Sequence, residues 1–163
     1  DPLQSLNAYL NFTKLGVVSN RYLPDFYGED PSSFLHQTGT DRLWVSWFLK
    51  SDRVQRLTTG VASEIEFVPG FSLVQVDADD SPRRNSLSAG LADAIASIEI
   101  PADINSLHQL KPETTLRWRE DTRWAFTAAI KAGYVVAGFV RETRENQRLG
   151  KYLLAKKSVH NFE

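Results

Sequence analysis

The segment DPLQSLNAYLNFTKLG at residues 1–16 carries the clearest structural pattern in the chain. Its apolar side chains recur every three or four residues, which predicts a helix over residues 4–15. Ser5 can cap the start of this helix, and Gly16 ends it. Residues 17–22 follow as a predicted strand, with Val17 and Val18 as its apolar part. The side chains that define the helical spacing are Leu6, Tyr9, Leu10 and Phe12.

Strands and helices alternate along the rest of the chain, which predicts an α/β or α+β fold. Residues 23–42 are rich in turn-forming residues and are predicted to be a long loop, a kind of segment that is often functional. Pro112 can begin a long helix over residues 112–132, which Gly133 ends. Further strands are predicted at 43–49 (buried), 64–67, 71–77, 95–100, 134–141 and 152–156, further helices at 51–58 and 102–110, and turns at 77–85 and 142–150.

The composition excludes several classes of protein. The chain has 163 residues, with 19 Lys and Arg against 20 Asp and Glu, a balance that argues against a general nucleic-acid or acidic-membrane binder. There is no Cys, which excludes disulfides and Cys-ligated zinc. The three His residues share no metal-ligand spacing, so no metal is expected. No apolar run is long enough to span a bilayer, and we expect a cytoplasmic protein without membrane or nucleic-acid partners.

The first helix is similar to a helix of the GNAT acetyltransferase superfamily, which reads approximately N-x-x-A-x-x-x-Y-x-K-x-G. Ala8, Lys14 and Gly16 match this pattern, whereas Ser5 takes the Asn position and Phe12 the Tyr position. In many GNAT enzymes that Tyr protonates the departing thiolate. A Phe side chain cannot donate a proton, so no catalytic residue is assigned here.

Further motifs extend the resemblance to nearly the whole chain. Together they resemble a family of predicted GNAT acyltransferases, some of whose relatives are associated with N-acylation, including N-succinylation, of amino acids. The resemblance implies that acetyl-CoA or another acyl-CoA is the co-substrate. The matching segments are 1–16, Tyr22 with FYG at 26–28, TDR at 40–42, IEIPADI at 98–104, WREDTR at 118–123 and GYVVAGFVR at 133–141.

The resemblance places Asp1 at the end of a strand in the middle of such an enzyme. The chain is therefore expected to be a C-terminal part, with a GNAT-like mixed sheet and flanking helices but without the first strands and the glycine-rich CoA loop. Residues 147–150 (QRLG) are the nearest candidate for that loop, but they lack a second glycine and a following helix and are predicted to be a hairpin turn. Residues 1–52 are predicted to be the C-terminal half of a GNAT-like domain. Residues 53–163 are predicted to be a second α/β lobe, a degenerate half-GNAT module that either completes the first sheet or packs separately.

Arginines and their neighbours supply the candidate acceptor site. Arg42 either binds a carboxylate of the acceptor or acyl group, or is a surface residue in a turn that Asp41 caps. Arg119 has no acidic neighbour in its own helix, so it pairs either with Glu99 or Asp103 or with a ligand carboxylate or CoA phosphate. Arg123 is one turn away, and Glu120 can offset the repulsion between the two arginines. A stripe of predicted core residues runs along the same helix. That stripe is Trp118, Thr122, Phe126 and Ile130.

The predicted function is that of an acyl-CoA-dependent N-acyltransferase acting on an amino acid or a similar small amine. The alternative is a non-catalytic binding or assembly lobe that needs another segment or chain to form the CoA site, either as a homodimer or with the missing N-terminal segment. The four Trp and nine Phe residues leave room for an apolar interface. The predicted cofactor-binding residues are Ser5, Asn7 and Asn11, and the predicted substrate-binding residues are Tyr22, Tyr27, Asp41, Arg42, Arg119 and Arg123.

Overall fold

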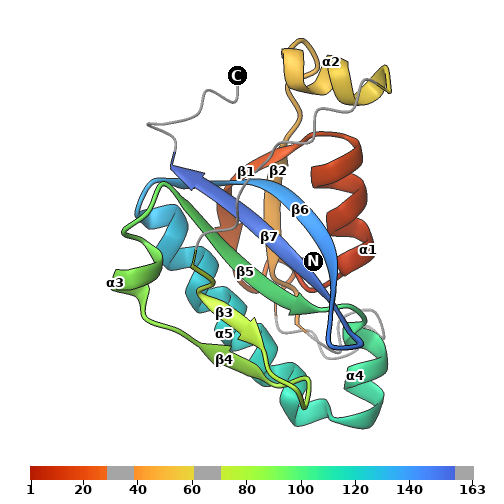
Figure 1. The fold of residues 1–163 in the computed structure, drawn as a ribbon, viewed down its shortest axis with the longest axis vertical. Helices are drawn as coiled ribbons and strands as arrows, with labels where there is room; N and C mark the ends of the chain where they lie inside the picture. Colours follow the sequence, from red (N-terminus) through yellow and green to blue (C-terminus); the bar gives the residue numbers. More distant parts are fainter. Residues whose placement is uncertain (29–38, 61–70, 157–163) are drawn as a thin grey trace.

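Five strands form one antiparallel sheet in the order β2–β1–β6–β7–β5 (Figure 1). The computed structural model describes residues 1–28, 39–60 and 71–156. Helices pack against this sheet, which confirms the prediction of a mixed α+β chain. The strands are β1 (Val18–Leu23), β2 (Arg42–Ser46), β5 (Ile95–Pro101), β6 (Tyr134–Arg144) and β7 (Gln147–Lys156).

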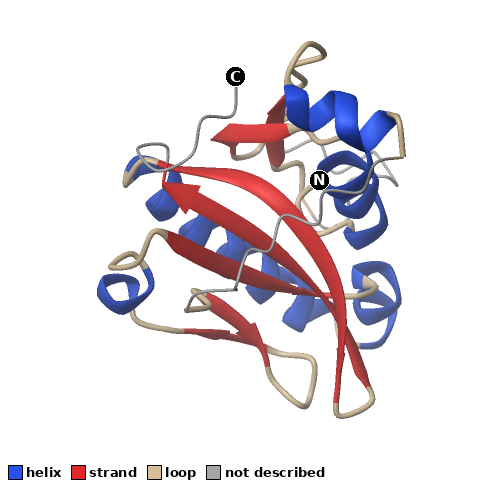
Figure 2. Cartoon of the chain, turned by 45° about the horizontal axis from the view of Figure 1, so that its top comes forward, coloured by secondary structure: helices blue, strands red, loops and turns tan. Residues whose placement is uncertain are grey.

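A small second sheet, formed by β3 (Val74–Val76) and β4 (Pro82–Arg84), lies beside β5 (Figure 2). The segment that leads into β3 runs parallel to β5, because Ser72 bridges Ser97 and the Leu73 amide donates to the Ser97 carbonyl at 2.8 Å. This contact attaches the small sheet to the edge of the large one.

The first helix begins as α1 (Ser5–Ala8) and continues without a break as the π-helix η1 (Tyr9–Lys14). This confirms a helical segment close to the predicted range. Its Phe12 ring packs edge-on against Tyr152 of β7, with ring centroids 5.6 Å apart. The other helices are α2 (Asp52–Thr58), α3 (Leu87–Gly90), α4 (Ile104–Leu110) and α5 (Pro112–Lys131).

Helix α5 buries one face in the core. Trp118, Thr122 and Phe126 are completely buried, as the stripe predicts, and Ile130 is half-buried. The Phe126 ring meets the same Tyr152 ring that Phe12 contacts, at a centroid distance of 5.0 Å. Helices η1 and α5 therefore share one aromatic cluster on the sheet.

The residue ranges 1–52 and 53–163 contribute to the same sheet and the same core. Strand β1 meets β6 where Ser19 pairs with Val136, and the Phe12–Tyr152 contact joins the two ranges in the interior. This is the arrangement in which the second half completes the first sheet. The boundary between the two ranges stays a prediction.

Several predicted elements differ from the structure at polar or edge positions. The predicted buried strand at 43–49 is wrong in its burial, because β2 is an edge strand in which the Trp44 and Val45 side chains are exposed. The predicted turn at 142–150 is wrong in its extent, because β6 and β7 continue to a tight turn at Glu145 and Asn146. Residues 147–150 thus begin β7 rather than forming the turn. The predicted turn at 77–85 contains the short strand β4, and the strand expected at 71–77 is shortened to β3. Helix α3 was not predicted. The strand predicted at 64–67 lies outside the described residues.

Candidate functional site

The carboxylate of Asp41 lies at the centre of the candidate site. It directly precedes β2 and is fully buried. The Tyr22 hydroxyl donates to it at 2.5 Å, and the Asp25 amide donates at 3.0 Å. Arg123 of α5 donates through Nε at 2.9 Å and through Nη2 at 2.7 Å. The site therefore joins β1, the loop after β1, the start of β2 and α5.

These hydrogen bonds decide the charge state of the carboxylate. Burial alone would raise the pKa of Asp41, but the bonds from Arg123, Tyr22 and the Asp25 amide outweigh burial and hold the pKa below its ordinary value. Burial and the adjacent carboxylate raise the pKa of Tyr22, so its hydroxyl stays protonated. The hydrogen bond to Asp41 makes the largest contribution to the raised pKa of Arg123. Asp41 is therefore ionised and Tyr22 is neutral at pH 7.

Arg119 lies one turn before Arg123 and is buried beside the same network. Its two terminal nitrogens donate to the two carboxylate oxygens of Asp1 at 2.9 and 3.0 Å, and it also bonds to Tyr22. The carboxylate partner is thus neither Glu99 nor Asp103. Gly39 packs against the guanidinium, since a Cβ there would lie 3.2 Å from Arg119 Nε and the glycine has a φ of +88°.

Arg42 and Tyr27 form the exposed side of the site. The Arg42 guanidinium donates to the backbone carbonyl of Asp41 at 2.7 Å and lies 5.1 Å from the centre of the Tyr27 ring. Tyr27 is 57% exposed, and Phe26 packs edge-on against it. The structure thus brings all six predicted substrate-binding residues into one network. Asp1 and Asp25, which the sequence interpretation missed, complete it.

The three predicted cofactor-binding residues are not brought together in one cavity. Ser5 is buried against the β6–β7 hairpin, where a Cβ at Gly150 would lie 3.1 Å from its Oγ. Asn7 is exposed, and the Asn11 side-chain amide donates to the Asn7 carbonyl at 2.8 Å along the helix. Only Ser5 lines a groove of about 530 Å³, between the starts of α1 and α4 and the β6–β7 hairpin.

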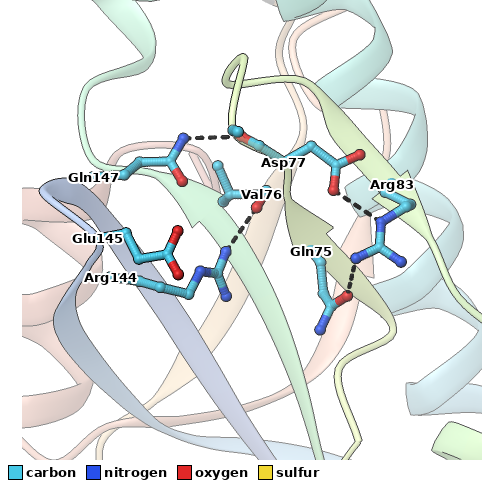
Figure 3. Close-up of a pocket in the computed structure, with 8 residues that line it drawn as sticks. Gln75, Val76, Asp77, Arg83, Arg144, Glu145 and Gln147 are labelled. Carbon is cyan, nitrogen blue, oxygen red and sulfur yellow. Dashed lines mark hydrogen bonds and ion pairs between the residues drawn. The ribbon is translucent and has the colours of Figure 1, made fainter.

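A second hollow of about 360 Å³ lies between β3 and the β6–β7 turn (Figure 3). One of its lining residues, Arg144, belongs to an ion-pair network that the sequence interpretation did not anticipate. Glu99, almost fully buried, accepts from Arg144 at 3.2 Å and from the Val76 amide at 2.9 Å, and Lys151 lies 3.6 Å away. Arg144 also donates to the Val76 carbonyl at 2.6 Å. These side chains hold β3 beside β5 where the backbone pairing ends.

Within residues 1–28, 39–60 and 71–156, no group of three or more His, Asp or Glu side chains is arranged to hold a metal ion. In the same residues, no helix combines the length and the apolar character needed to cross a bilayer. Comparison of the chain with protein-family models, with curated proteins and with solved structures gives no significant match. The geometry and the motifs therefore carry the functional argument.

Proposed function

We propose that this chain belongs to an acyl-CoA-dependent N-acyltransferase of the GNAT type, and that it binds an amino acid or a similar small amine as the acyl acceptor. The observation that carries the proposal is the meeting of the six predicted substrate-binding residues in one network that includes Asp41. They come from β1, the following loop, the start of β2 and α5, and they meet beside the GNAT-like segment that runs from α1 to β2.

The arginines of this site have different roles in the proposal. Arg119 and Arg123 already neutralise Asp1 and Asp41, so their charges are used within the protein. Among the described residues, Arg42 has no carboxylate partner, and it contacts the Asp41 backbone carbonyl and the Tyr27 ring. We assign Arg42 to the carboxylate of the acceptor because a guanidinium matches a carboxylate with two parallel hydrogen bonds. The buried residues hold Arg42 in place.

The proposed reaction is direct attack of the neutral acceptor amine on the thioester carbonyl. A C–N bond forms and the C–S bond breaks, so CoA leaves as a thiolate. The proton that the amine loses goes either to solvent or to this thiolate, which becomes the CoA thiol. Positioning of the two reactants supplies much of the rate in such a transfer. The proposal places the thioester near α1 and η1, where Ser5, Asn7 and Asn11 lie, and it assigns no residue as the acid.

The proposal is tested by following CoA thiol release from acetyl-CoA and succinyl-CoA with a panel of amino acids, using the longest natural form of the protein. Arg42→Gln should raise KM for the acceptor by about 10-fold or more and leave KM for the acyl-CoA unchanged. Arg21→Gln, which changes an exposed arginine of the neighbouring strand β1, is the matched control and should leave both unchanged. Absence of thiol release above background with every donor and acceptor would contradict the proposal.

A second candidate function is an assembly lobe, and the exposed edge of the sheet favours it. Large apolar side chains are exposed along β2 and just after it, an arrangement that is typical of an interface. Static light scattering over a range of concentrations separates the two functions. A monomer at all concentrations argues against self-assembly, whereas a stable dimer that lacks thiol release supports the assembly role. The exposed side chains are Trp44, Val45, Trp47, Phe48 and Leu49.

A further inference from the structure

The groove beside α1 has a floor that is formed by one face of the β6–β7 hairpin. In this hairpin Arg141 pairs with Gly150 and Thr143 pairs with Arg148, so these four residues point to the same side of the sheet. Ser5 packs over Gly150 and therefore marks this side as the one that α1 covers. Figure 1 shows α4 close to the end of the same hairpin. The two arginines consequently face the groove from adjacent strands.

The positive charge of this groove is not cancelled by ion pairs. Arg141 and Arg148 are both exposed, and neither forms an ion pair with any described residue. The Arg141 guanidinium lies over the Tyr9 ring, 5.5 Å from its centre. A guanidinium over an aromatic ring keeps its hydrogen-bond donors available. The groove therefore offers two sets of unused donors.

Two acidic residues, Asp103 and Glu142, also line the groove. Asp103 caps α4 by accepting from the Asn105 and Ser106 amides, both at 3.0 Å, and from the Ser106 hydroxyl at 2.6 Å. Glu142 points to the other side of the hairpin, where Lys151 donates to it at 2.8 Å. Lys151 therefore neutralises Glu142, whereas Asp103 keeps its negative charge, because the bonds from Ser106 lower its pKa and Arg148 lies close enough to help lower it. The groove is left with the two guanidinium groups against the one carboxylate of Asp103, so its net charge is still positive.

A pair of amides fixes one wall of the groove. The Gln4 side chain donates to Asn105 at 3.1 Å, and Asn105 donates back to Gln4 at 3.4 Å. This reciprocal contact ties the start of α1 to the start of α4 across 101 residues of sequence. The distance between the two helix starts is thereby set, and the groove exists before any ligand arrives.

We infer that this groove binds the phosphate group of a small phosphate monoester through Arg141 and Arg148. A phosphate monoester carries about two negative charges near pH 7, which matches two guanidinium groups better than the single charge of a monocarboxylate does. The volume of about 530 Å³ is sufficient for a metabolite-sized molecule. This inference rests on the groove alone and goes beyond the proposed acyl transfer, which it does not require.

The test is isothermal titration calorimetry of the full chain with inorganic phosphate at pH 7.5 and low salt, with succinate as a carboxylate dianion for comparison. Phosphate should bind saturably and more tightly than succinate. Arg141→Gln and Arg148→Gln should each weaken phosphate binding by about 10-fold or more, and the double variant should abolish it. Arg56→Gln is the matched control, because Arg56 is an exposed arginine of α2 outside the groove, and it should leave binding unchanged.

Three results of the titration would contradict the inference or the choice of ligand. Absence of saturable phosphate binding to the folded chain, or equal binding by the double variant, overturns the inference. Tighter binding of succinate than of phosphate overturns the assignment of a phosphate group. Circular dichroism establishes that each variant is folded, and Arg141→Lys and Arg148→Lys, which keep the charge, serve as second variants if a Gln variant does not fold.

Discussion

Asp41 and Arg123 form a two-point ion pair although they are 82 positions apart in the sequence. Both carboxylate oxygens of Asp41 are used, one by Nε and the other by Nη2 of Arg123. The pair joins the residue that precedes β2 to the middle of α5. Because the carboxylate is fully buried and the arginine is only partly exposed, the contact is less screened by solvent than a surface ion pair would be. The candidate site is therefore positioned by the core helix.

Replacing Asp41 should destabilise the whole chain. Asp41→Asn keeps the size of the side chain but removes the charge that four hydrogen bonds stabilise, and we expect the free energy of unfolding to fall by about 2–3 kcal/mol. Urea unfolding at pH 7 measures this change. Asp25→Asn is the control, since Asp25 is an exposed partner of the same arginine and should cost less than about 1 kcal/mol. Equal costs for the two variants would refute the central role of Asp41.

The Asp41 carboxylate should make the free energy of unfolding decrease at acidic pH. Because its hydrogen bonds lower the pKa of Asp41 in the folded state, the unfolded chain binds this proton first as the pH falls. The stabilisation is complete above the unfolded pKa of about 4 and is lost as the pH falls through the lower folded pKa. Urea unfolding between about pH 6 and pH 2.5 should therefore show a smaller loss of stability in Asp41→Asn than in the wild type. Parallel curves would exclude this contribution.

Tyr22 should be a positioning residue rather than an acid. Its ring stacks on Phe126 with centroids 5.5 Å apart, and its hydroxyl donates to Asp41. Tyr22→Phe keeps the stacking and removes one donor, so we expect a loss of about 1–2 kcal/mol in unfolding free energy. It should also raise the pKa of Asp41 and move the acid unfolding midpoint toward higher pH. In an acyl-transfer assay, the pH profile of kcat should keep its shape, whereas loss of an acid limb would reassign Tyr22 to the chemistry.

Gly150 should be intolerant of a side chain. A Cβ at this position would lie 2.3 Å from the Phe139 ring and 3.1 Å from Ser5 Oγ, so Gly150→Ala forces the Phe139 ring or α1 to move. We expect a loss of about 1–3 kcal/mol, measured by thermal or urea unfolding. Gly138→Ala is the matched control in the same hairpin, where the nearest atom belongs to the Leu153 side chain at 3.3 Å and can shift. A larger loss in Gly138→Ala than in Gly150→Ala would contradict this packing.

Substitutions in the turn of the β6–β7 hairpin should stabilise the chain. Glu145 and Asn146 both have positive φ, at +49° and +69°, and a two-residue hairpin turn of this kind favours Asn followed by Gly. Glu145→Asn together with Asn146→Gly should raise the free energy of unfolding by about 0.5–1 kcal/mol. Chemical unfolding of the double variant measures the change. Glu142→Asn within β6 is the comparison, since it breaks the contact with Lys151 and should not stabilise the chain.

The parts of the fold that were predictable are those with a local pattern. The stripe from Trp118 to Phe126 repeats at helical spacing, and Pro112 and Gly133 mark the ends of the helix, so α5 could be placed from the sequence. The extension of β6 and β7 toward Glu145 could not be placed in this way. Its side chains are mostly polar and exposed, and each strand is defined there by hydrogen bonds to the other.

The candidate site was predictable in its residue types but not in its pairing. The absence of an acidic neighbour on α5 indicated correctly that Arg119 needs a distant partner. That partner is Asp1, which is 118 positions away in the sequence, so no local spacing could identify it. The burial of β2 was mispredicted for a related reason. A strand dense in Trp and Val has the composition of an interior strand, and only the strand order shows that it lies at an edge.

The position of β1 between β2 and β6 has a consequence for biosynthesis. A ribosome releases β1 and β2 long before it makes β6. During that time β1 can pair with β2, but β6, its neighbour on the other side, has not yet been synthesised. Two-stranded ribbons are marginal in water, and contacts between distant residues slow folding. Until β6 emerges, the edge of β1 that pairs with it lacks this partner, and an unpaired strand edge is prone to pair with other chains. The pairing of β1 with β6 therefore has to wait for the last third of the chain.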